Sequence, residues 1–192
     1  MASPKHLMTV NHLEAIPYDE WHRYELIDSK LYVSCAPSIS HQLVLGNLQF
    51  KLGNYLRDNP LGTVVPGPGA IFSEYDSVIP DIVYVRHERW ESIVAGEHFN
   101  AAPDLIVEIL GTGASCFRDL ELKRKLYEKY GVQEYWIVDD SSRSVMIFRL
   151  EANTLKKVAT FRENGVIESL MFPGLSLKLS DIFTEDLNAF LT

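Results

Sequence analysis

The sequence has few of the features that mark membrane, secreted or disulfide-bonded proteins. Its longest uninterrupted apolar runs are about four or five residues, far below the roughly 20 that a transmembrane helix needs. Its two cysteines, Cys35 and Cys116, lie far apart and in neither a redox nor a metal-binding spacing. No apolar segment follows Lys5, so the start of the chain does not resemble a signal peptide. These absences predict a cytoplasmic protein with reduced thiols and no membrane segment.

Positive charge is also scarce. The chain has 18 Lys and Arg against 26 Asp and Glu, a net charge of −8. Proteins that coat nucleic acid neutralise its phosphates with Lys and Arg, so this balance argues against a coating protein. It does not exclude an enzyme that touches DNA locally, because carboxylates gathered around a metal ion also add negative charge.

The remaining composition is that of an ordinary globular protein. Hydrophobic residues make up 46% and charged residues 23% of the 192 residues. This length suits one domain, and no Pro-, Gly- or Ser-rich stretch is long enough to be a linker. We therefore expect a single domain over residues 1–192, with a core at about 20–140 and a C-terminal β-extension at about 144–185.

Apolar periodicity predicts alternating strands and helices through the middle of the chain. The expected elements, in chain order, are strands 24–27 and 30–33, a helix from about 40 to 56, strands 82–85 and 105–110, a helix 119–130, strand 134–138, strands 145–149, 155–161 and 166–171, and a short helix after Leu179. The expected class is α/β (α+β), with a mixed central sheet flanked by helices, an N-terminal hairpin and a C-terminal β-meander.

Glu108 is the most informative single residue. Its strand, 105–110, is apolar at nearly every other position, as in a strand covered on both faces. A carboxylate there costs several kcal/mol unless it is paired or binds a metal. Taken alone, Glu108 fits an ion-paired structural group and a functional group equally well.

Asp81 and Lys123 are the other two candidates. Asp81 follows Pro80 and opens the preceding strand, which is also a common place for a turn-forming aspartate. Lys123 shares a helix face with Leu126 and Tyr127, so it either reaches a buried anion or extends to solvent. The structural interpretation is favoured for each alone. Together the three are more consistent with a site, because each charge offsets the cost of the others.

Two carboxylates without a Cys or His cluster favour Mg²⁺ or Mn²⁺ over zinc. Such an ion lowers the pKa of water and offsets charge on a phosphodiester. A lysine beside it orients the attacking water or stabilises developing negative charge. The residue types therefore indicate metal-dependent phosphodiester hydrolysis.

These residues resemble the PD-(D/E)xK nucleases, and most closely a small bacterial "putative restriction endonuclease" family. The usual lysine two residues after the glutamate is replaced by Leu110, and the lysine of this family lies on the next helix. The resemblance covers about residues 15 to 180. It is carried by the segments 24–28 (YELID), 41–42 (HQ), 80–83 (PDIV), 103–108 (PDLIVE), 119–127 (Asp-x3-Lys-x3-Tyr) and 131–139 (GVQEYWIVD).

The resemblance implies a restriction-endonuclease-like core and assigns roles. Asp81 and Glu108 would bind the metal, Lys123 would act on the water or the transition state, and Glu25 would be a further acidic residue of the site. Asp104 would lie just behind the ligands, although a strand-start role is slightly favoured. For His41, a core histidine bonded to backbone is favoured over a general base. Glu25 could equally be an ion-pair partner within the hairpin.

The sequence departs from the family pattern at three turns. Residues 111–115 (GTGAS) replace the usual turn after the glutamate strand, residues 28–30 lack a glycine, and residues 139–140 lack a proline. The acidic pair and the lysine are intact. The differences put the loop beside the site, and hence the fit of the substrate, in question.

Three functions compete. The first is a Mg²⁺- or Mn²⁺-dependent DNA endonuclease. It is expected to be a homodimer, because two-fold symmetry suits cleavage of both strands of a duplex. The helix 40–56 and the late meander offer surface for the dimer contact. The second is a catalytically inactive nuclease-fold module that binds nucleic acid or protein, favoured by the net negative charge and the altered turn. The third is a carboxylate-pair hydrolase of sugars, which leaves Lys123 unexplained and ranks last.

Overall fold

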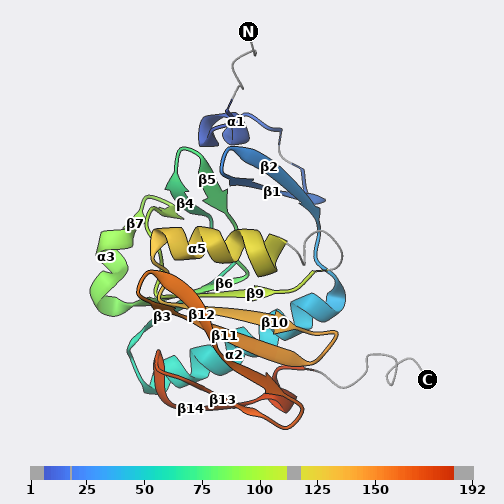
Figure 1. The fold of residues 1–192 in the computed structure, drawn as a ribbon, viewed down its shortest axis with the longest axis vertical. Helices are drawn as coiled ribbons and strands as arrows, with labels where there is room; N and C mark the ends of the chain where they lie inside the picture. The colour runs from blue at the N-terminus through green and yellow to red at the C-terminus, as the bar shows by residue number, and fades with distance from the viewer. Residues whose placement is uncertain (1–6, 18, 112–117, 184–192) are drawn as a thin grey trace, which may run out of the picture.

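The computed structural model describes residues 7–17, 19–111 and 118–183, and its centre is a six-stranded mixed sheet (Figure 1). The strand order is β12-β11-β10-β9-β6-β3. Only β9 and β10 are parallel among these neighbours. The strands are β3 (Gly62–Pro66), β6 (Ile82–Arg86), β9 (Leu105–Ile109), β10 (Glu134–Asp139), β11 (Ser144–Glu151) and β12 (Thr154–Arg162).

A second six-stranded sheet, which the sequence did not predict, has the order β2-β1-β5-β4-β8-β7. The predicted N-terminal hairpin is confirmed as its β1 and β2. The turn residues Asp28 and Ser29 have φ values of 49° and 61°, the left-handed conformation that a two-residue hairpin turn needs. The strands are β1 (His22–Ile27), β2 (Lys30–Cys35), β4 (Ala70–Ser73), β5 (Asp76–Val78), β7 (Val94–Ala95) and β8 (His98–Phe99).

The helices cover the two faces of the central sheet. The predicted helix 40–56 is confirmed as α2 (Ile39–Asp58), and the Ser38 hydroxyl caps it by accepting from the His41 backbone N–H at 3.2 Å. The predicted helix 119–130 is instead a π-helix, η2 (Arg118–Lys123), followed by α5 (Arg124–Tyr130). The short helices are α1 (Val10–Glu14), η1 (His87–Arg89), α3 (Trp90–Ile93) and η3 (Leu179–Asp181).

The expected C-terminal meander is corrected by the sheet pairing. β11 pairs with β10, and β12 pairs with β11, so both strands belong to the central sheet and do not form a separate extension. Only β13 (Val166–Ser169) and β14 (Phe172–Lys178) form a separate hairpin. Where a helix is expected after Leu179, the structure has the 3₁₀ turn η3, which ends at Asp181. Residues beyond 183 lie outside the described residues, as does Cys116.

The central sheet separates two apolar cores. On one face, α2 and the β13–β14 hairpin pack on residues such as Trp136 and Leu105. On the other face, α5 and the second sheet pack on residues such as Ile106 and Tyr135 (Figure 1). Among the described helices, none combines the length and the apolar character needed to cross a membrane.

The buried face of α2 generates a stability prediction. Leu48 is fully buried while Phe50, two residues later, is 65% exposed. Replacing Leu48 with Ala leaves a cavity and should lower the free energy of unfolding by about 2–5 kcal/mol. Phe50→Ala should change it by no more than about 0.5 kcal/mol. Urea unfolding of the two variants measures both values, and similar losses would contradict the packing described for α2.

Candidate functional site

Asp81 and Glu108 lie opposite each other at one end of the central sheet. β6 and β9 pair antiparallel, with Ile82 opposite Val107 and Val83 opposite Ile106. Continuing this register by one residue sets Asp81 opposite Glu108, so both side chains project from the same face. That face is the one covered by α5.

Lys123 completes the cluster from the helical segment above this face. Its Nζ lies 2.9 Å from Glu108 Oε1 and 2.9 Å from Glu25 Oε1. Glu25 comes from β1 of the second sheet, so the contact joins both sheets to the helix. Glu25, Asp81, Glu108 and Lys123 are all buried. Lys123 therefore reaches a buried anion and does not extend to solvent.

Neighbouring groups hold the carboxylates in place. The Tyr127 hydroxyl, one turn after Lys123, donates to Glu108 Oε1 at 2.5 Å. The Ile79 backbone N–H donates to Glu25 Oε1 at 2.9 Å. Asp81 Oδ2 accepts from the Ile109 backbone N–H at 2.8 Å. Each acid is thus oriented by at least one group besides Lys123.

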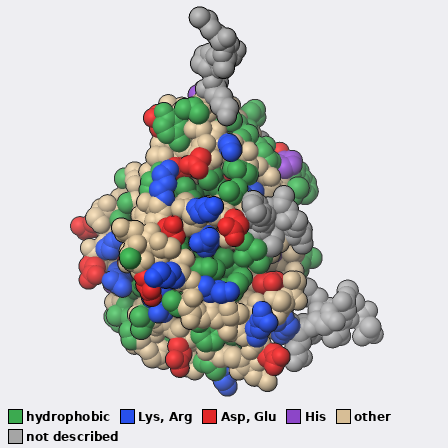
Figure 2. All heavy atoms as spheres, in the orientation of Figure 1, with side chains coloured by type: hydrophobic (Ala, Val, Ile, Leu, Met, Phe, Trp, Pro, Cys, Tyr) green, Lys and Arg blue, Asp and Glu red, His purple; other side chains and the backbone are tan. Residues whose placement is uncertain are grey.

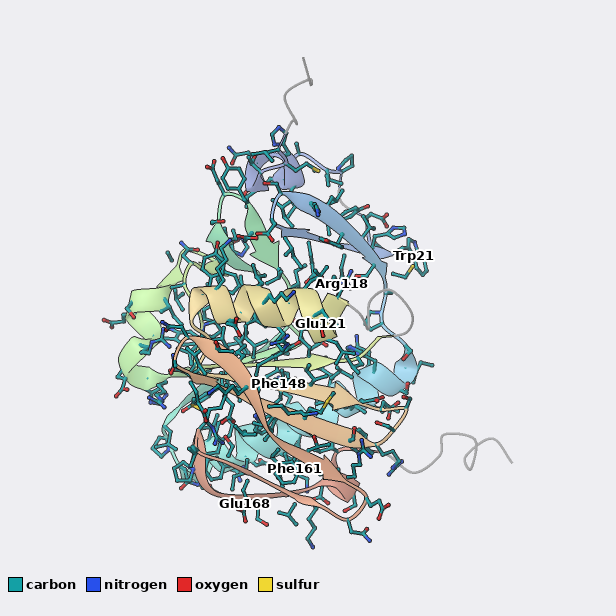
Figure 3. All side chains as sticks on the ribbon, viewed as in Figure 1. Trp21, Arg118, Glu121, Phe148, Phe161 and Glu168 are labelled. Carbon is teal, nitrogen blue, oxygen red and sulfur yellow. The ribbon has the colours of Figure 1, made fainter. Side chains whose placement is uncertain are left out.

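The π-helix brings two further charged residues that the sequence reasoning did not select. Asp119 Oδ1 lies 3.6 Å from Lys123 Nζ, and Arg118 Nε lies 3.5 Å from Glu25 Oε2. Both residues are buried. Figure 3 shows Arg118 at the end of the helical segment nearest the β1–β2 hairpin. The spacing Asp119-x3-Lys123 was a usable signal, because residues four apart on a helix share a face.

His41 and Asp104 have different surroundings. His41 Nε2 lies 3.1 Å from Asp81 Oδ2, so its ring contacts an acid of the site and not backbone. Asp104 lies at the other end of β9, about 13 Å along the strand at roughly 3.3 Å per residue. It accepts from the Arg86 backbone N–H at 2.9 Å and pairs with Arg89 at 2.9 Å. Asp104 is therefore separate from the cluster.

Burial sets the protonation of the acids. Burial raises the pKa of Glu108 from 4.5 to about 8, although the Lys123 ammonium opposes this. Burial likewise raises the pKa of Asp119 to about 6. For Asp81, burial is outweighed by the hydrogen bonds from His41 and the Ile109 N–H, and its pKa lies below the ordinary value.

The pKa of Lys123 is raised, which favours the charged ammonium. Burial lowers the pKa of this ammonium, but the carboxylates of Glu108, Glu25 and Asp119 outweigh burial and raise it above 10.5. Lys123 is therefore cationic at neutral pH, and it is the central positive charge of the cluster.

The donor chemistry fits a hard divalent cation. Within the described ranges, no three His, Cys, Asp or Glu side chains form a group that could hold a metal by themselves. Mg²⁺ typically uses one or two carboxylates and keeps several waters, so the facing pair Asp81 and Glu108 supplies enough protein ligands. The four carboxylates Glu25, Asp81, Glu108 and Asp119 face three cations, Arg23, Arg118 and Lys123. The acids outnumber these cations only when Glu108 has lost its proton, so a divalent ion bound there would take the place of that proton.

Of the three turns that depart from the family pattern, the structure describes 28–30 and 139–140 in full, and only residue 111 of 111–115. Asp28 and Ser29 form the β1–β2 hairpin turn, and Asp139 accepts from the hydroxyls of Ser141 and Ser142. Residues 112–115 of the altered turn after β9 lie outside the described residues.

Comparisons with known proteins give a family for this chain and a solved structure with the same fold. The model of the Uma2 family, described as putative restriction endonuclease, matches residues 10–180. A solved structure from Anabaena variabilis ATCC 29413, described as a putative nuclease belonging to DUF820, aligns with a TM-score of 0.75 and 19% sequence identity. The alignment covers 91% of this chain and 97% of that one, and at this identity it shows the fold. None of the curated proteins compared matches this chain.

The raised pKa of Glu108 predicts an inverted pH dependence of stability. Between about pH 4.5 and 8 the folded state holds a proton on Glu108 that the unfolded state releases. The stabilisation is therefore complete at low pH and is lost as the pH rises through about 8. Without divalent metal, the free energy of unfolding should fall between pH 6 and 8.5, by at most about 1.4 kcal/mol per pH unit for one proton.

Denaturant unfolding at several pH values in EDTA measures this slope. Glu108→Gln should remove most of the slope, whereas Glu121→Gln, at a side chain 47% exposed, should keep it. Equal slopes in wild type and Glu108→Gln would show that Glu108 is ionised throughout.

Proposed function

The chain belongs to the Uma2 family of putative restriction endonucleases, and from this membership and its buried cluster we propose that it is a metal-dependent endonuclease acting on DNA phosphodiester bonds. The observation that carries the proposal is the meeting of Asp81, Glu108 and Lys123 at one end of the sheet. A lysine that pairs with a buried carboxylate in this way supplies positive charge where a phosphate would gain negative charge.

Each residue has a distinct part in the proposed reaction. Asp81 and Glu108 would hold Mg²⁺ or Mn²⁺, which when bound acidifies water and offsets phosphate charge. Lys123 orients the attacking water or stabilises the negative charge that develops on the phosphate oxygens. Glu25 keeps Lys123 on this face through the 2.9 Å ion pair. The Tyr127 hydroxyl fixes the rotamer of Glu108.

The charge on the protein surface supports a DNA substrate less strongly than the buried cluster does. Figure 2 shows Lys and Arg side chains over α5 and the neighbouring strands, interspersed with Asp and Glu. Several are paired, such as Arg124 with Glu121 at 3.5 Å and Lys156 with Glu151 at 3.5 Å. This face is therefore not a continuous positive strip, and we assign DNA as substrate from the cluster and the family.

The proposed homodimer needs a surface other than the apolar face of α2. That face, formed by Val44, Leu48, Leu52 and Leu56, is buried in the chain's own core. The exposed apolar side chains of the same helix are Ile39 and Phe50. A two-fold homodimer that cuts both strands of a duplex would therefore have to form through other surfaces and leave the core contacts of α2 intact.

A second candidate function is a catalytically inactive module that binds nucleic acid or protein. The observation that favours it is the burial of the whole cluster, with Glu108 and Lys123 at 2% and 3% exposure. Lys123 already pairs with both Glu25 and Glu108, so these buried acids have a cation beside them without a metal.

Metal titration and plasmid nicking separate the two candidates. Isothermal titration should show that wild type binds Mg²⁺ or Mn²⁺ and that Asp81→Asn binds it at least about 10-fold more weakly. Lys123→Met should bind the ion but nick supercoiled plasmid at least about 100-fold more slowly.

The matched control for this experiment is Lys125→Met, an exposed lysine on α5, which should nick at the wild-type rate. Wild type that binds no divalent ion, with or without DNA, would reject the nuclease and favour the inactive module. Metal binding with equal nicking by the Lys123 and Lys125 variants would reject the role of Lys123.

A further inference from the structure

Lys123 donates unequally to the three carboxylates around it. An ammonium has three donor hydrogens. Two are directed at Glu25 Oε1 and Glu108 Oε1, each 2.9 Å from Nζ. Asp119 Oδ1 lies 3.6 Å from the same nitrogen, which is beyond hydrogen-bond distance. Lys123 therefore has one acceptor close by that it does not yet use.

Asp119 Oδ1 is an unused buried acceptor. Among the residues that the structure describes, none hydrogen-bonds to this oxygen. Arg118 Nε is the other cation nearby, at 3.9 Å, and it too has no hydrogen-bond partner within the described chain. Buried carboxylate oxygens are almost always hydrogen-bonded, so an oxygen left open beside an ammonium needs an explanation.

The backbone keeps Asp119 in this position. Its carbonyl oxygen accepts from the Tyr135 hydroxyl at 2.9 Å, which ties the first turn of η2 to β10. Asp119 and Lys123 both belong to the π-helix, a form that occurs mostly as short stretches at functional sites. The fold therefore holds the Asp119 backbone beside Lys123, and the separation of the two charged groups can change only through their side chains.

We propose that Asp119 is a positioning residue that receives the Lys123 ammonium when Glu108 turns its Oε1 toward a divalent metal ion. The inference rests on the proposed function, because it requires that ion. Glu108 Oε1 already accepts from both Lys123 and Tyr127, and a cation on the same oxygen repels the ammonium. The nearest open acceptor is Asp119 Oδ1, so Lys123 keeps its charge and stays beside the site.

A double-mutant cycle on Mn²⁺ affinity tests whether the Lys123 ammonium moves from Glu108 to Asp119. Dissociation constants are measured by titration for wild type, Asp119→Asn, Lys123→Met and the double variant. Asp119→Asn should weaken Mn²⁺ binding at least about 10-fold when Lys123 is present, because the uncharged amide oxygen attracts the ammonium less and Lys123 then stays on Glu108. In the Lys123→Met background the same substitution should weaken binding less than about 3-fold.

Two further variants separate positioning from plain charge. Asp119→Glu should restore most of the affinity, since it returns a negatively charged acceptor for Lys123. Glu121→Gln removes an exposed negative charge from the same helical segment and should leave the affinity unchanged. An equal loss in both Lys123 backgrounds would show that Asp119 acts only as a negative charge and would overturn the inference.

If Lys123→Met fails to fold, a crystal structure of wild type with Mn²⁺ tests the inference from the position of Lys123. Lys123 Nζ should lie within about 3.0 Å of Asp119 Oδ1 and should have left Glu108 Oε1. Bound Mn²⁺ with Lys123 still on Glu108 would overturn the inference alone. No Mn²⁺ binding by wild type would overturn both this inference and the proposed metal-dependent function.

Discussion

The ion pair of Lys123 with Glu25 and Glu108 is the constraint on which the rest of the structure depends. These three residues come from the π-helix η2, from β1 and from β9, so one ammonium joins two sheets and a helical segment. Each carboxylate would be costly if buried alone. Because all three are buried, this charge offsets the cost of burying two acids where the second sheet packs against the central one, next to the apolar contacts of the same interface.

The sequence predicted the parts of the site that follow from local patterns. Glu108 stood out because a carboxylate interrupts an apolar strand, and Lys123 because helical spacing set it beside Leu126 and Tyr127. The placement of Asp81 opposite Glu108 needed only the assumption that β6 and β9 are neighbours, which the pairing confirms. The presence of Asp119 in the cluster was missed because an aspartate four residues before a lysine is usually a surface pair on a helix, and its burial here depends on tertiary packing.

The parts of the fold that were not predicted have weak local signals. β7 and β8 are two residues long, too short for any alternation to show. The β13–β14 hairpin was missed because 166–171 reads as one strand, while β14 contains Pro173 and Gly174, which normally argue against a strand. Such a strand is tolerated here because it forms only a two-stranded sheet with β13.

The burial of the acidic cluster also determines how it would bind a metal ion. With the pKa of Glu108 at about 8, a divalent ion at neutral pH must displace a proton from this carboxyl as well as the ammonium from its oxygen. Metal binding would then release protons and strengthen as the pH rises. An inactive module and a nuclease would share this fold and this ion pair, and they would differ in whether the cluster exchanges the Glu108 proton for a divalent ion.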